Sequence, residues 1–193
     1  MGYPYDNSDS TGHMILSTHA VVGAAIASFL PSHPIAAFVL GFASHFILDA
    51  IPHWDYRIKS TSVNPNIGEP MIFDRALLQD ALTIGSDALL GIVAALFLFA
   101  SAESLWAILL GSFGAMLPDP LQFAHVRLPR APLRTLQLFH RWMHTDRQIG
   151  PVLGICSQLA LVASIVAVAT AAHRGVFGAA FAMAYGNGTF CFI

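Results

Sequence analysis

Charged residues are scarce in this chain, and their scarcity limits what the protein can be. Of its 193 residues, 10% are Asp, Glu, Lys or Arg and 55% are hydrophobic, and the mean hydropathy is +0.63. Soluble domains carry roughly 25% charged residues, so the composition predicts an integral membrane protein. The net charge of -2 leaves no basic stripe to neutralise phosphates along a duplex, which argues against a nucleic-acid partner.

Cysteine and glutamate are also rare. The two cysteines, Cys156 and Cys191, stand alone in apolar runs and predict neither a disulfide framework nor a zinc knuckle. Glu69 and Glu103 are the only glutamates, and the sequence contains no His-Glu-x-x-His motif. An intramembrane metalloprotease is therefore a weak alternative.

The first 13 residues differ from the rest of the chain. They are polar, lack the apolar core of a signal peptide, and end in Gly12-His13 before a second methionine, Met14. This pattern predicts a vector-derived leader over residues 1–13 and a single domain over residues 14–193.

Six apolar segments at or near spanning length follow, at 15–30, 35–53, 81–100, 104–118, 151–172 and 176–192. Because roughly 20 residues cross a bilayer, we predict an all-α fold, a polytopic transmembrane bundle of about six (five to six) helices. A tight turn is expected at 173–175. Whether 176–192 spans fully is left open, because Gly186-Asn187-Gly188 interrupts it.

Lys and Arg concentrate in the two long connections, 55–79 and 121–150. The positive-inside rule places these connections in the cytoplasm of a prokaryotic-type plasma membrane. With six crossings, both chain ends lie on the same side, so the N-terminus is expected to be cytoplasmic.

The most informative stretch runs from His45 to Asp55, His-Phe-Ile-Leu-Asp-Ala-Ile-Pro-His-Trp-Asp. His45, Asp49 and His53 have i, i+4, i+8 spacing, which keeps them on one stripe of a helix. Pro52 is expected to bend or end that helix. His53 and Asp55 would then turn toward the cytoplasmic mouth while His45 and Asp49 point inward.

Other histidines and aspartates fall at the same predicted depth, where an unpaired charge costs at least about 2.5–3.5 kcal/mol. Arg and Lys lie in the loops, so a divalent cation is the natural partner. Taken singly, some of them have simpler explanations: His19 as a capping-region residue, Asp119 as a turn residue, His140 and His144 as residues of a surface helix, and Asp87 as a partner of helix hydroxyls. His140 and His144 share an i, i+4 face and are expected to clamp one metal. The predicted ligands are His19, His45, Asp49, His53, Asp87, Asp119, His140 and His144.

Three motifs together resemble the YdjM-type family of membrane-bound metal-dependent hydrolases: Thr18-His19, Leu117-Pro118-Asp119, and His140-Arg-x-x-His144. The chain lacks the second acid of the family's Pro-Asp-x-Asp, and its histidines are one residue closer together. Asp49 or Asp87 would then supply the missing acid. The His45-x-x-x-Asp49 helix with His53 downstream is also similar, more loosely, to the metal sites of zinc-dependent phospholipase C and P1-type nucleases, which implies phosphoester chemistry.

We therefore predict a hydrolase that uses one to three divalent metal ions, with two expected. Zinc is the expected metal, and Mn and Mg are the alternatives. A metal-activated water would attack a phosphoester of a lipid or other amphiphilic substrate at the cytoplasmic face. Asp55 or Asp49 is expected to be the general base, and Arg141 to contact an anionic group of the substrate. The alternatives are a divalent metal-ion transporter or sensor, and a scaffold with a closed metal site.

Overall fold

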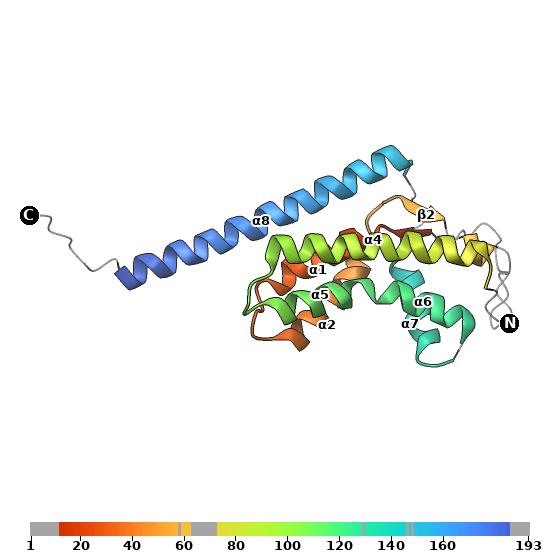
Figure 1. Ribbon diagram of the computed structural model, residues 1–193, viewed down its shortest axis with the longest axis horizontal. Coiled ribbons are helices and arrows are strands. Elements are labelled where there is room, and N and C mark those ends of the chain that lie inside the picture. The colour runs from red at the N-terminus through yellow and green to blue at the C-terminus, as the bar shows by residue number, and fades with distance from the viewer. Residues whose placement is uncertain are drawn as a thin grey trace, which may run out of the picture.

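The computed structural model in Figure 1 describes residues 12–57, 59–62, 73–128, 130–145, 147 and 149–185. This part of the chain is helical apart from a short antiparallel ribbon, so the predicted all-α fold is confirmed. The elements in chain order are β1 (Gly12–Met14), α1 (Leu16–Ala27), α2 (Pro34–Asp49), β2 (Asp55–Arg57), α3 (Lys59–Ser62), α4 (Arg75–Phe99), α5 (Leu105–Met116), α6 (Pro118–Arg127), α7 (Leu133–Met143) and α8 (Pro151–Tyr185).

The centre of the fold is formed by α1, α2 and α5. Each of these three helices packs against the other two. A Cβ atom added to Gly23 in α1 or to Gly41 in α2 would collide with the carbonyl group of Gly111 in α5. Small residues let helices approach this closely where the surroundings give no hydrophobic drive for association. The glycine pattern therefore fixes the relative positions of three helices, including α2.

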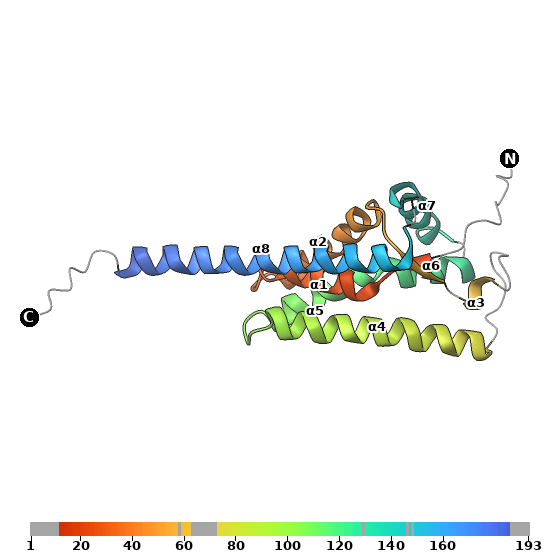
Figure 2. The ribbon, with the colours of Figure 1, turned by 90° about the horizontal axis from the view of Figure 1, so that it is seen from above.

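The helices α4 and α8 flank this centre (Figures 1 and 2). α4 contacts α1 and α5, and α8 contacts α1. Both leave large apolar side chains on the outside: Phe97 is 88% exposed and Val168 is 69% exposed. Among the described residues, two helices are long and apolar enough to cross a membrane by length and composition, α4 and the Pro151–Gly175 part of α8.

The predicted six membrane spans stay a prediction, because only two of the described helices reach spanning length. α1, α2 and α5 contain 12, 16 and 12 residues, fewer than the roughly 20 that cross a bilayer alone. The predicted turn at 173–175 is wrong, because α8 continues through it to Tyr185. No proline follows Pro151 in this helix, and a glycine such as Gly175 costs a helix interior only about 1 kcal/mol. Residues 186–192 lie outside the described residues.

The end of α2 agrees with the prediction made from Pro52. The helix stops at Asp49, so His45 and Asp49 keep their helical spacing while His53 lies beyond it. β2 then begins at Asp55, which pairs with Met14 of β1. Gly12 and His13, inside the predicted leader, also pair with β2. The rest of that leader, residues 1–11, lies outside the described residues, and the predicted domain boundary stays a prediction.

We expect Gly41→Ala to destabilise the protein by about 1–3 kcal/mol, because the new methyl group meets backbone that must shift. Gly85→Ala is the matched control: its added Cβ meets nothing within 4 Å, and alanine is the better helix former. Thermal unfolding followed by circular dichroism in detergent compares the two variants. Equal melting temperatures would contradict the close-packing account.

Candidate metal centre

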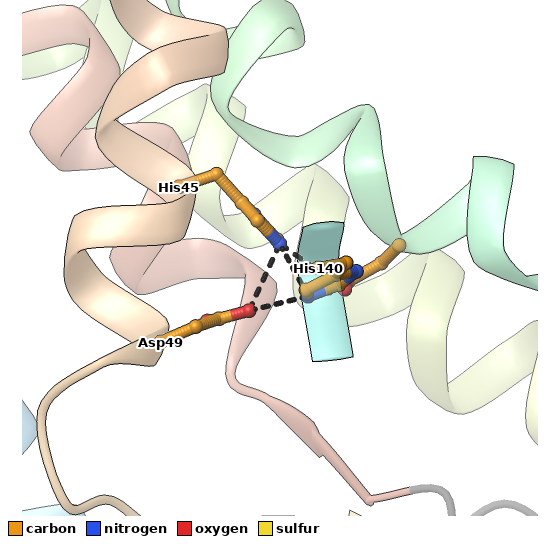
Figure 3. A group of neighbouring side chains, drawn as sticks. His45, Asp49 and His140 are labelled. Atoms are coloured by element: carbon orange, nitrogen blue, oxygen red, sulfur yellow. Dashed lines mark hydrogen bonds and ion pairs between the residues drawn. The ribbon is translucent and has the colours of Figure 1, made fainter. Parts of the chain in front are cut away.

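Four buried side chains from three helices converge at one end of the bundle. His45 and Asp49 lie one turn apart on α2, Asp119 lies in the first turn of α6, and His140 lies near the end of α7. Each offers one ligand atom, and these atoms all lie within 4.8 Å of one another. We call these four residues the inner group; Figure 3 shows three of them pointing toward a common centre.

The Asp49 carboxylate is the centre of the inner group. Its Oδ2 atom lies 2.7 Å from Nε2 of His140 and 3.1 Å from Nε2 of His45. The two Nε2 atoms are 3.3 Å apart, and Nε2 of His45 is 3.4 Å from Oδ1 of Asp119. Two ring nitrogens and two carboxylates that face one another this closely are the ordinary donor set of a divalent transition metal.

The orientation of His45 is set from behind by the backbone. Its Nδ1 lies 2.8 Å from the carbonyl oxygen of Ala115 in α5. A carbonyl group only accepts, so Nδ1 carries the proton, and in the neutral ring Nε2 keeps its lone pair toward the inner group. A histidine that donates its other N–H to a carbonyl group is the usual outer-shell arrangement of a metal ligand.

His19 of α1 lies beside the inner group and is completely buried. Its ring stacks on His45 with centroids 4.2 Å apart, and its Nε2 is 3.3 Å from Oδ1 of Asp49. Neither ring nitrogen, nor that Asp49 oxygen, makes a hydrogen bond to the residues that the structure describes. Leaving buried polar atoms unsatisfied is costly, and a bound cation would satisfy the carboxylate. The residues present therefore fit a metal ion.

A second group, the outer group, consists of His53, Asp55 and His144, whose ligand atoms also lie within 4.8 Å of one another. Nε2 of His53 is 2.7 Å from Oδ1 of Asp55, and the two histidine rings have centroids 5.1 Å apart. Both rings donate Nδ1–H to backbone carbonyl groups, at 2.6 Å for His53 and 3.0 Å for His144. Each Nε2 atom is thereby left for a ligand role.

Backbone pairing between two loops builds the outer group. The amide of Thr145 donates to the carbonyl of Asp49 at 2.9 Å, and the amide of Ile149 donates to the carbonyl of His53 at 3.2 Å. These bonds hold the segment after α7 against the segment after α2. The buried Gln158 of α8 adds a third tie, since its Nε2 donates to the Trp54 carbonyl at 3.0 Å.

The electrostatics of His53 reflect its neighbour. Burial lowers the pKa of His53, but the hydrogen bond to Asp55, the charge of that carboxylate, the Ile51 carbonyl and the charge of Asp49 all raise it, and the net effect is a raised pKa. The pKa of His53 therefore lies above its ordinary value. A positive charge is thus favoured at this position, whether a proton or a metal ion supplies it.

The structure separates two histidines that the sequence pattern joined. His140 and His144 were predicted to clamp one metal, but His140 belongs to the inner group and His144 to the outer group. α7 ends at Met143, but the His144 amide still donates to the His140 carbonyl at 2.8 Å, so the two side chains keep their i, i+4 relation. The extended backbone of His144, with ψ of 134°, leads Thr145 away to pair with Asp49, and the His144 ring lies beside His53. The rings are 6.0 Å apart, so the two groups adjoin.

Asp87 and Arg141 are not in either group. One Asp87 oxygen lies 3.4 Å from the backbone N–H of Ser17, in the first turn of α1, so this carboxylate satisfies a helix terminus. Arg141 is exposed on α7. The structure brings the other predicted residues together: Asp55, the predicted base, lies in the outer group, and His19 lies beside the inner group.

Two contributors to the site were missed from the sequence. The Ala115 carbonyl carries no side-chain signal, so no pattern could have identified it. Gln158 did offer a signal, because it is an isolated amide in a long apolar helix and its buried side chain needs partners.

The two groups differ in what they can do chemically. The inner group offers four buried donors, which suits a closed site, whereas the outer group offers three donors with His144 only half-buried. Catalytic zinc sites keep one coordination position open for water. The outer group is therefore the better candidate for a reactive site, because its two histidines leave coordination positions open and the Asp55 carboxylate lies beside them.

Comparison with known proteins gives no match: none of the protein-family models, curated proteins or solved structures matches this chain. The family expected from the His and Asp motifs therefore stays a prediction.

The two groups predict separable metal binding. We expect His140→Ala and His144→Ala each to lower the zinc content of the purified protein by about one ion per chain, because each removes a ligand from a different group. The double variant should lose both ions. Elemental analysis after dialysis measures the stoichiometry.

His125→Ala is the control for this measurement, since His125 is buried on α6 but belongs to neither group. A single ion lost equally in both single variants, with no further loss in the double variant, would show that the histidines share one metal as the sequence pattern suggested.

Proposed function

We propose that this protein is a membrane-embedded, metal-dependent hydrolase that cleaves a phosphoester of a lipid or other amphiphilic substrate. The observation that carries the proposal is the pairing of a closed four-donor group with an adjoining three-donor group that is partly exposed. When bound there, divalent metals would lower the pKa of a water toward about 7 and polarise the scissile bond. The YdjM-type resemblance is consistent with this chemistry.

We assign the remaining catalytic roles to three side chains of the protein. Asp49 contacts three histidines, and we assign it the role of shared ligand. Asp55 lies in the outer group, within 2.7 Å of His53. We assign it the role of general base, in which it would take the proton from the attacking water. Arg141, exposed next to His140, is the candidate contact for an anionic group of the substrate.

Two features support placement at a bilayer surface. The outward-facing apolar surfaces of α4 and α8 suit lipid contact, and both groups lie near α6 and α7, at one end of the bundle (Figure 1). In addition, α7 leaves Leu138 and Trp142 59% and 77% exposed, one turn apart, while Arg134 and Arg141 are also exposed. A short helix with exposed apolar and basic residues is typical of the membrane interface.

A divalent metal transporter or a non-catalytic metal protein is the second candidate. The closed inner group favours it, because four buried donors can hold an ion without chemistry. Transporter sites, however, usually lie near the bilayer midplane, whereas both groups here lie toward one end. We therefore prefer the hydrolase.

The test is turnover of a soluble phosphodiester, bis(p-nitrophenyl) phosphate, by the zinc-loaded protein in detergent. Asp55→Asn should lower kcat by about 10²–10⁴-fold, the usual contribution of a general base, while the zinc content stays unchanged. His33→Ala should keep full activity, since His33 lies at the far end of α2 from Asp49.

Absence of metal-dependent turnover in the wild-type protein would contradict the hydrolase and favour the metal-binding alternative. Loss of zinc from Asp55→Asn would instead make Asp55 a ligand, and the general base would then have to be another group.

A further inference from the structure

Two hollows follow one another along the inner side of α8. The first, with a volume of about 290 Å³, begins at Pro52 and His53 and is lined on α8 by Gln158, Leu161 and Ser164. His53 is a member of the outer group. One end of this hollow is therefore part of the candidate metal centre.

The second hollow, of about 480 Å³, adjoins the first at Ser164, which lines both. Apart from that hydroxyl its lining is apolar, with Phe29 beyond α1, Leu40 of α2, and Ile165 and Val168 of α8. We call the two hollows together the α8 groove. It leads from the outer group toward the opposite end of α1.

The shape and chemistry of the α8 groove fit one kind of ligand. Its polar groups gather at the His53 end, and the remainder offers almost no hydrogen-bonding group. Between Ser157 and Val168 it follows α8 for about 16 Å at 1.5 Å per residue, comparable with a long acyl chain. An apolar groove of this length with one polar end matches an amphiphile that has a polar head group and a long hydrocarbon chain.

The groove is also reachable from the side. Phe29 is 49% exposed and Val168 is 69% exposed, so its far part opens on the outer surface of the bundle, next to the apolar face of α8. A lipid could therefore enter laterally without leaving the bilayer. A soluble phosphoester would gain nothing from this apolar extension.

We propose that the α8 groove holds the hydrocarbon chain of a phospholipid-type substrate whose phosphate group lies at His53, Asp55 and His144. The inference rests on the proposed function and deepens it, because it names a long-chain phosphate ester as the substrate class. The hydrocarbon chain would set the depth at which the phosphate meets the outer group.

The experiment uses the zinc-loaded full chain in phosphatidylcholine vesicles and a long-chain alkyl phosphonate that carries a diazirine in mid-chain. Illumination should label peptides of α8 around Ile165 and Val168, as mapped by mass spectrometry. Ser164→Trp, which fills the junction of the two hollows, should lower this labelling at least tenfold. It should also lower at least tenfold the ratio of kcat/KM for a long-chain ester to that for a short-chain ester.

Leu159→Trp is the matched control, since Leu159 is exposed on α8 and does not line the groove. It should change neither the labelling nor the ratio. Equal labelling and equal ratios in the two tryptophan variants would overturn the groove assignment, even if short-chain turnover is intact. Absence of any turnover in the wild type would overturn the hydrolase; the labelling would then decide alone whether the groove binds a lipid chain.

Discussion

The carboxylate of Asp49 is the interaction on which the site depends. Its oxygens face His19 of α1, His45 of its own helix and His140 of α7, at 2.7–3.3 Å. Its backbone carbonyl also accepts the amide of Thr145. Asp49 therefore links α1 and α2 to α7 and to the loop that follows α7. A carboxylate buried this deeply needs compensation by positive charge, and the surrounding histidine nitrogens make a metal ion the natural source.

The position of Asp49 is in turn fixed by close helix packing. Gly41 lies two turns before Asp49 on α2, and the Gly111 backbone leaves no room there for a Cβ atom. Further along α5, the Ala115 carbonyl orients His45. The contact between α2 and α5 thus sets the position of Asp49 along the bundle and the orientation of the His45 ring. The packing of the apolar helices therefore determines the geometry of the candidate metal centre.

The sequence allowed the helical class and most members of the inner and outer groups to be predicted, because a histidine or aspartate in an apolar segment must find a partner. The end of α2 was also predictable, since Pro52 cannot continue a helix. The division into two groups was not, because it depends on where α7 ends and on backbone bonds from Thr145 and Ile149 that leave no side-chain signal. The partner of Asp87 could not be predicted for a similar reason: it is a backbone N–H group at the start of α1, 3.4 Å away.

The candidate metal centre lies at the end of the apolar bundle, and the α8 groove begins there, at His53. The most direct test of the central claim is a metal-edge anomalous difference map from crystals of the zinc-loaded protein. We expect two peaks, one among His45, Asp49, Asp119 and His140 and one among His53, Asp55 and His144. A map without a peak at Asp49, with this carboxylate bonded to protein groups alone, would contradict the account.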